Sequence, residues 1–177
     1  NIIATLLINQ IYRESVYTKT LKRKKIDLRQ GREANLLRHI SVESIVRKEY
    51  VSILESTNIR QFKDILRQSH QDCFIGVDAD GRLKGMITFQ NICEVAFEEG
   101  GFNELALIKD ISIHNPKTIT PHETLYDAFL RFEANNNVEQ IPVVDPIDSS
   151  IVIGMISNQD MIRAYNMALL SQHSSRD

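Results

Sequence analysis

The sequence predicts an α/β protein of mixed α+β type, in which two β-α-β-β-α repeats pack with pseudo-twofold symmetry after a helical linker. The first observation is that the segment GMITFQNI, which starts at Gly85, returns as GMISNQDM at Gly154, 69 residues later. The second is that apolar positions further upstream recur 66 residues apart, from Ile53 to Ile119. A unit that cannot bury its apolar face alone packs against its copy, and a groove between near-copies suits a small ligand.

The composition is the third observation. The chain has 177 residues, of which 42% are hydrophobic and 25% charged, so it is long enough to bury a core. Its net charge of −2 argues against electrostatic binding of nucleic acid. Cys73 and Cys93 lie in or beside apolar segments, which favours a reducing compartment over a disulfide scaffold.

Residues 1–39 read as a juxtamembrane linker. The apolar stretch Ile2–Ile11 is shorter than the roughly 20 residues that span a bilayer, so it is either the end of a longer hydrophobic helix or an amphipathic helix packed on the body. The segment that follows, Tyr12–His39, is strongly basic, with nine of the 21 Lys and Arg residues, as cytoplasmic membrane flanks are. A solvated connector is the alternative, and Lys22–Lys25 has no interleaved aromatic residues that would indicate nucleic-acid binding.

The first repeat is expected over residues 40–98, where apolar periodicity and turn residues mark each element. The expected elements are a short helix from Ser41 to Val46, a strand at Val51–Leu54, a helix capped by Ser56 or Thr57 that buries Ile59, Phe62, Ile65 and Leu66, strands at Cys73–Val77 and Leu83–Thr88 joined by the turn Asp78–Gly81, and a helix at Asn91–Phe97 ended by Glu98–Gly101.

The second repeat is expected over residues 107–170 and copies that order. Its expected elements are a strand at Lys117–Thr120, a helix opened by Pro121–Glu123, hairpin strands at Ile141–Val144 and Ile151–Ser157, and a final helix at Gln159–Gln172. The tail, residues 171–177, is polar and is expected to fray.

One motif carries candidate chemistry. Gly154, Ser157 and Asp160 place a strand end, a hydroxyl and a carboxylate around one helix N-terminus, where backbone N–H groups favour anions. Ser157 could donate to a phosphate and Asp160 could accept both hydroxyls of a ribose, although Ser and Asp are also favourable caps in any helix. The first repeat has Thr88 and Asn91 at these places, so it lacks the charge.

These paired motifs, each preceded by an apolar strand such as Ile141–Asp145, resemble tandem CBS domains (a Bateman module) over about residues 40 to 170. The resemblance implies that an adenine nucleotide binds in the inter-repeat cleft and that its occupancy regulates an attached enzyme, transporter or channel.

The segments Ile11–Leu21 and Gly31–Leu37 resemble the connection between the last membrane helix of CLC chloride channels or chloride–proton exchangers and their CBS pair. This resemblance implies a regulatory module of a voltage-gated chloride channel or an exchanger, at the cytoplasmic face of a membrane. Its partners would be the membrane-embedded transport domain of the same chain and, in a homodimer, a second copy. Apolar helical faces at Phe89–Phe97 and Met161–Leu170 also suggest an interface.

The resemblance also implies a site. Asp160 matches the ribose carboxylate, Ser157 lies beside it, and the adenine of ATP, ADP or AMP would contact Tyr50, Val51, Gln71, Asp72 and Cys73. Relatives often carry an aromatic residue in place of Gln71, so stacking on adenine is weakened here. A second, weaker cleft would involve Asn91, Thr88 and Thr118, and it lacks the carboxylate.

The chain shows no phosphate-binding loop, nucleophile elbow or His-Glu-x-x-His motif, and its five histidines are scattered without metal-ligand spacing. We therefore expect no enzyme, no metal site and no required cofactor. Two alternatives stay open, namely a purely structural dimerisation domain of the same transporter and a CBS pair that regulates another protein.

Overall fold

The computed structural model describes residues 32–97, 106–134 and 138–174. The described residues from 35 onward belong to one compact unit, and residues 32–34 belong to a separate unit at the start of the chain. The expected apolar start, most of the basic linker and the expected helix end at Glu98–Gly101 lie outside the described residues. Within the described ranges, no helix has both the length and the apolar character needed to cross a bilayer.

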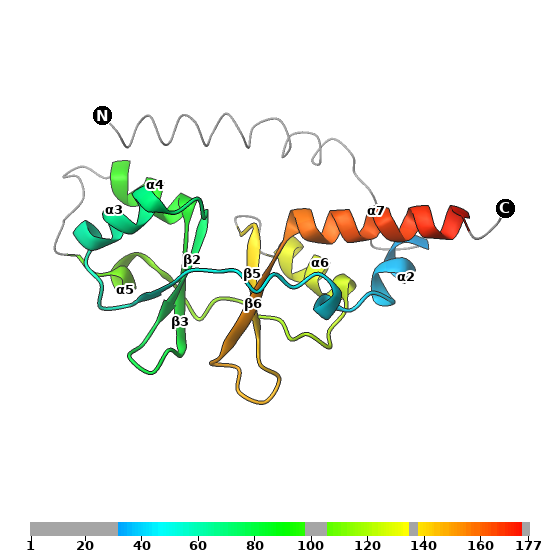
Figure 1. The fold of residues 1–177 in the computed structure, drawn as a ribbon, viewed down its shortest axis with the longest axis horizontal. Helices are drawn as coiled ribbons and strands as arrows, with labels where there is room; N and C mark the ends of the chain where they lie inside the picture. Colours follow the sequence, from blue (N-terminus) through cyan, green and yellow to red (C-terminus); the bar gives the residue numbers. More distant parts are fainter. Residues whose placement is uncertain (1–31, 98–105, 135–137, 175–177) are drawn as a thin grey trace. The chain divides into compact units, whose positions relative to one another are not determined.

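The first repeat has the predicted β-α-β-β-α order. Its elements are β1 (Ser52–Leu54), α3 (Ile59–Gln68), β2 (Cys73–Val77), β3 (Leu83–Thr88) and α4 (Phe89–Phe97). Strand β1 runs parallel to β2, and β2 pairs antiparallel with β3. The β2–β3 turn contains Gly81 at a φ of 76°, a left-handed conformation that glycine adopts without strain. Figure 1 shows α3, α4 and α5 together on one side of this hairpin.

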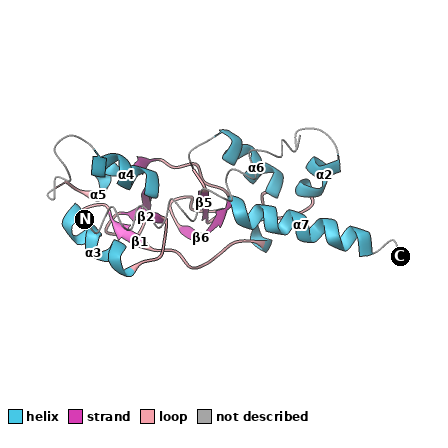
Figure 2. Ribbon diagram, turned by 90° about the horizontal axis from the view of Figure 1, so that it is seen from above, coloured by secondary structure: helices cyan, strands magenta, loops and turns pink. Residues whose placement is uncertain are grey.

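The second repeat is built in the same way, except that the counterpart of β1 is reduced to a single bridge at Ile119. Its elements are α5 (Ile108–Ile111), β4 (Ile113–His114), α6 (Leu125–Ala134), β5 (Gln140–Val144), β6 (Val152–Ser157) and α7 (Asn158–Ser174). Strands β5 and β6 form a two-stranded antiparallel sheet, and β4 joins the first repeat to make a four-stranded sheet of order β1-β2-β3-β4. Figure 2 shows the strands of both repeats between the helices α3–α5 and the helices α6 and α7.

The segment that opens each repeat crosses to the other repeat. In the first repeat, a short 3-10 helix η1 (Val42–Ser44) and the residues after it bond to the segment just before α6 and to β6, while in the second repeat α5 and β4 run along β3. The same two pairings occur in both directions: Ser41 with Thr124 matches Leu107 with Asn58, and Arg47 with Met155 matches Ile113 with Met86. This reciprocity is the predicted pseudo-twofold symmetry.

The core at the junction of the repeats is shared by both hairpins. Strands β2 and β3 contribute Cys73, Ile75 and Met86, and strands β5 and β6 contribute Val144, Val152 and Met155. A second core lies within the first repeat, where the rings of Phe62 and Phe74 meet edge to face with centroids 5.2 Å apart. The described core residues that are buried are all hydrophobic, so the repeats are joined mainly by apolar packing.

The predicted strand at Lys117–Thr120 is wrong, because only Ile119 makes a single parallel bridge, to Val143. The reason lies in the neighbouring strand. In the first repeat, the N–H of Ile75 donates to the carbonyl of Val51 at 2.9 Å, whereas the corresponding position in β5 is Pro142, which has no N–H to donate. One ladder bond is therefore lost, and the strand is not extended.

Several predicted helix boundaries also need correction. Ser41 does not cap a helix through Val46, since only η1 forms there and the Ser41 side chain makes no cap bond. Helix α3 is capped by Asn58, not by Ser56 or Thr57. Helix α6 begins at Leu125 rather than at Pro121–Glu123, α4 begins two residues earlier than expected, and α7 continues to Ser174, into the segment that was expected to fray.

Candidate functional site

The start of α7 places Ser157 and Asp160 in direct contact. The Asp160 Oδ2 atom accepts hydrogen bonds from the Ser157 N–H at 3.0 Å and from the Ser157 hydroxyl at 2.6 Å, and the Asp160 N–H donates to Ser157 Oγ at 3.1 Å. These bonds satisfy backbone groups that the first turn of a helix leaves without intrahelical partners. Both residues therefore cap α7, and the cap fixes the position of the carboxylate.

Arg47 brings a positive charge to the same carboxylate. Its Nε atom lies 3.0 Å from Asp160 Oδ2, and the Asp160 side chain is only 11% exposed. Arg47 is placed there by two main-chain bonds to Met155 in β6, one from its own N–H at 2.9 Å and one to its carbonyl at 2.8 Å. A residue near the start of the first repeat thus forms an ion pair with the carboxylate of the second.

Tyr50 and Val51 continue this crossing segment. The Tyr50 hydroxyl donates to the Val152 carbonyl in β6 at 2.8 Å, and the Tyr50 ring packs on the core at the junction of the repeats. The Val51 carbonyl accepts from the Ile75 N–H, and its side chain packs on the core of the first repeat. Tyr50 thus reaches across to the second repeat, whereas Val51 is held within the first, and both support the fold.

Gln71, Asp72 and Cys73 lead into β2. Gln71 is exposed, the Asp72 carbonyl accepts from the Phe89 N–H at 2.9 Å, and the Cys73 side chain is buried among the junction core. Burial, reinforced by the charge of Asp72, raises the pKa of the Cys73 thiol to about 12. The thiol therefore stays protonated at neutral pH and behaves as an apolar core group.

Cys73 and Tyr50 pack on one core with Val152 and Met155, and Met155 pairs with Arg47, which holds Asp160. The structure thus links these expected site residues through β6.

The second, weaker candidate cleft lies at the start of α4 and has the same kind of helix cap, but without a charged residue. Asn91 Oδ1 accepts from the Thr88 N–H at 3.0 Å and from the Thr88 hydroxyl at 2.7 Å. The residue that corresponds to Arg47 is Ile113 in β4, so no ion pair forms there. Thr118 is half-buried, beside the single bridge of Ile119. Among the described residues, no group of three or more potential metal ligands is assembled anywhere.

A family profile, described as the CBS domain, matches residues 42–98 and 108–166. The chain belongs to the CBS domain family and carries two copies of the domain. The profile covers most of the chain, and the reciprocal crossing described above relates its two copies.

Solved CBS pairs share this fold. One in complex with 5′-methylthioadenosine and S-adenosyl-L-methionine is 23% identical, with a TM-score of 0.60 over 71% of this chain and 95% of that one. Another, named CBSX2 and solved in complex with AMP, is 15% identical, with a TM-score of 0.59 over 72% and 97%. A CBS domain protein from Thermoplasma acidophilum is 17% identical, with a TM-score of 0.62 over 76% of each chain.

A curated relative is chloride channel protein CLC-f from Arabidopsis thaliana. It is 35% identical over 60 residues, which are 34% of this chain and 8% of the relative. The chain therefore matches a small part of that protein's length.

The sequence did not lead us to name Arg47 among the candidate site residues. A signal was present, since the comparison of repeats pairs Arg47 with Ile113 and Asp160 with Asn91, so that each repeat carries one charge where its copy has a neutral residue. The pairing of Arg47 with β6 was not foreseen, and without it the two charges are 113 residues apart with no reason to meet.

Proposed function

We propose that this CBS pair is the regulatory module of a CLC-type chloride channel or chloride–proton exchanger and that it senses an adenine nucleotide at the junction of its repeats. The observation that carries the sensing role is the partly buried Asp160 carboxylate, held at the start of α7 beside the segment Arg47–Val51 of the other repeat. CBS domains in general regulate rather than catalyse, and two of the similar pairs were solved with adenosine compounds or AMP.

In this proposal, each part of the nucleotide contacts a different group at the junction of the repeats. A ribose hydroxyl donates to Asp160, a phosphate meets the N-terminus of α7 near Ser157, and adenine lies near Tyr50, Val51 and the residues that lead into β2, namely Gln71, Asp72 and Cys73. Because Cys73 and Val51 are engaged in the core and in the sheet, recognition of adenine there would depend on main-chain atoms and on Gln71.

The transporter part of the proposal is supported by the match to CLC-f and by the CLC-like segments before the first repeat. In this proposal residues 1–39 connect the membrane-embedded domain of the same chain to repeats at 40–98 and 107–170, with a polar tail at 171–177, and the module lies at the cytoplasmic face of a membrane. Nucleotide occupancy would then change gating or transport through the linker.

The test is calorimetric titration of ATP, ADP and AMP into the wild-type chain and into Asp160→Asn. The first repeat shows that asparagine makes the same cap, so this variant is expected to fold while losing the charge. We expect its affinity to fall about tenfold or more, since hydrogen bonds to charged groups contribute about 1.5–3 kcal/mol.

Asp127→Asn is the matched control for this titration. Asp127 accepts from the N–H and hydroxyl of Thr124 at the start of α6, in the same capping arrangement, but it has no part in the proposed site. The control should bind as the wild type does. Equal binding by Asp160→Asn and wild type would remove Asp160 from the site, and no binding by the wild type would refute the sensing role.

A second candidate is a structural module that only holds two transporter subunits together. The observation that favours it is exposed apolar side chains on the helices of the second repeat, with Met167 of α7 66% exposed and Leu130 of α6 44% exposed. Such side chains commonly mark interfaces, and twofold dimers are the commonest closed assemblies.

A further inference from the structure

The Arg47 side chain has one ion pair and an otherwise open guanidinium group. Its Nε atom contacts Asp160 Oδ2, while the side chain is 47% exposed. Within the described part of the chain, its two terminal nitrogens have no hydrogen-bond partner. Because these nitrogens form a planar fork that suits phosphate, Arg47 can take an anion on the side that faces away from the carboxylate.

Asp160 Oδ2 is already saturated. It accepts hydrogen bonds from the Ser157 N–H and hydroxyl at 3.0 and 2.6 Å, which use the about two lone-pair sites of one carboxylate oxygen, and Arg47 Nε lies 3.0 Å from it in an ion pair. An incoming hydroxyl must use Oδ1 or displace one of these partners. The Ser157 bonds also hold the start of α7, whereas an ion pair with an exposed partner contributes about 0–1 kcal/mol, so Arg47 is the partner that leaves most easily.

The Arg47 backbone cannot move with the side chain. Its N–H and carbonyl are both bonded to Met155, and the carbonyl lies so close to Gly154 that a Cβ on that residue would be 2.6 Å away. The guanidinium group therefore swings about a fixed Cα position, and it stays near the start of α7, where a phosphate is favoured.

The equivalent place at the start of α4 supports a joint role for the two charges. There the counterpart of Arg47 is Ile113 and the counterpart of Asp160 is Asn91, and the cap of α4 by Thr88 and Asn91 forms without either charge. The fold thus does not need the ion pair to build this helix start. Of the two equivalent places, the one with the carboxylate also has the arginine, which comes from the other repeat.

We propose that Arg47 determines which ligands the site accepts, as the counter-ion of Asp160 in the ligand-free chain and as a phosphate ligand when a nucleotide is bound. This inference rests on the proposed sensing function and adds a specificity to it. A nucleoside without phosphate competes with Arg47 for the carboxylate and gives the guanidinium group nothing in return. A phosphorylated nucleoside occupies both groups and is therefore preferred.

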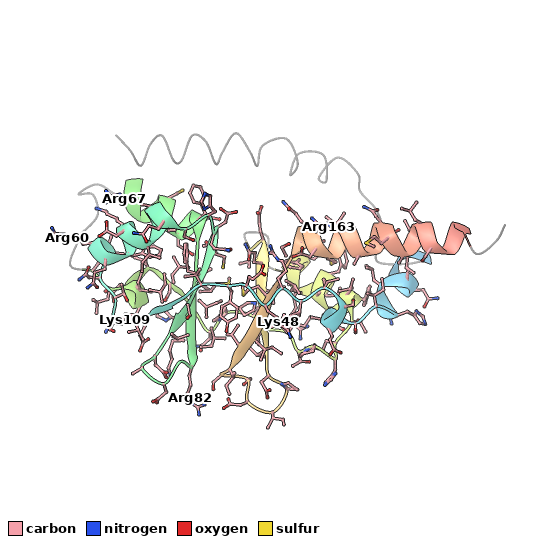
Figure 3. The ribbon with its side chains drawn as sticks, viewed as in Figure 1. Lys48, Arg60, Arg67, Arg82, Lys109 and Arg163 are labelled. Atoms are coloured by element: carbon pink, nitrogen blue, oxygen red, sulfur yellow. The ribbon has the colours of Figure 1, made fainter. Side chains whose placement is uncertain are left out.

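The experiment compares AMP with adenosine by calorimetry on the 177-residue chain, in the wild type, Arg47→Gln, Arg47→Lys and Lys48→Gln. Lys48 is the neighbouring exposed basic residue on the same crossing segment (Figure 3), and its substitution removes the same charge from outside the ion pair. Thermal unfolding of each variant establishes that it is folded, which is expected because the Arg47 side chain is half-exposed.

We expect Arg47→Gln to lose about tenfold or more of the preference for AMP over adenosine, with adenosine binding unchanged or tighter. Arg47→Lys should fall between wild type and Arg47→Gln, because it keeps the charge but loses the planar fork. Lys48→Gln should keep the wild-type preference.

Two results overturn the inference alone: an unchanged AMP preference in Arg47→Gln, or an equal loss in Lys48→Gln, which would indicate a general charge effect. Failure of the wild type to bind either compound overturns the proposed sensing function and the inference with it. The two failures are thus distinguishable.

Discussion

Gly154 and Gly85 stand where a segment of the other repeat crosses a hairpin strand. A Cβ on Gly154 would lie 2.6 Å from the Arg47 carbonyl oxygen and 2.7 Å from a methyl group of Val46. A Cβ on Gly85 would lie 2.6 Å from the hydroxyl of Ser112, a side chain that can rotate. The glycine that opens each repeated motif is thus required by close approach of the crossing chain, and not by the ligand.

This difference predicts the cost of adding a methyl group. Gly154→Ala must displace backbone, so we expect a loss of about 2–3 kcal/mol in the free energy of unfolding, while Gly85→Ala should lose less. Gly76→Ala is the control, because the nearest atom to its Cβ is 3.4 Å away, close to an ordinary contact. Urea unfolding of the three variants measures the order, and a Gly154→Ala chain as stable as Gly76→Ala would contradict it.

At the scale of elements, the motif read as a ligand site is first a capping device. The same arrangement of Ser or Thr with a carboxylate or amide three residues later holds the starts of α4, α6 and α7, and a related turn forms between Thr120 and Glu123. The motif alone therefore cannot identify a site. What distinguishes Asp160 is the arginine that the crossing segment delivers to it.

Helix α3 offers a test of capping without any role in binding. Asn58 accepts from the Gln61 N–H at 2.9 Å, and the Gln61 side chain accepts from the Asn58 N–H at 3.4 Å. We expect Asn58→Ala to lower the free energy of unfolding by about 1 kcal/mol. Ser56→Ala, at an exposed position two residues earlier, should change it by less than about 0.5 kcal/mol. Thermal or urea unfolding measures both values. Equal losses in the two variants would contradict the assignment of Asn58 as the residue that caps α3.

Local patterns predicted most elements but not all of their boundaries. The periodicity around Phe62 and the turn at Asp78–Gly81 gave α3 and the first hairpin, because these depend on nearby residues. The cap of α3 was misplaced because Ser56, Thr57 and Asn58 are all good caps, and only the bond to Gln61 selects one of them. The failed strand at Lys117–Thr120 depended on a missing N–H in another strand, at Pro142.

For the whole molecule, the duplication in the sequence predicted the pseudo-symmetric pairing of repeats but not how they are joined. The crossing of residues 41–50 and 107–114 involves contacts between distant parts of the chain, and periodicity does not report such contacts. The hairpin loops add a second link, in which Arg82 bonds to Asp148 at 2.9 Å and to Ser150 at 2.6 Å. Bonds from Ser150, with the charge of Arg82, hold the pKa of Asp148 below its usual value.

The proposed homodimer also belongs to this scale. Leu130 and Met167 lie on α6 and α7, two helices that contact each other, and both side chains are more exposed than apolar core residues would be. If these helices form the interface, glutamates at both positions should weaken association about tenfold or more, because a charge buried at an interface without a partner costs more than 1.4 kcal/mol. Sedimentation at tens of micromolar should then show a wild-type dimer and a largely monomeric Leu130→Glu/Met167→Glu chain.

Ile147→Glu is the control for this measurement, because Ile147 is an apolar residue that is 96% exposed on the β5–β6 loop, away from both helices. It should remain dimeric, since a glutamate there stays in solvent. A monomeric wild type would contradict the second candidate function, in which the module holds two subunits together. A dimeric double variant would instead place the interface elsewhere on the molecule. The nucleotide experiments on Asp160 and Arg47 are independent of either result, because those residues lie at the junction within one chain.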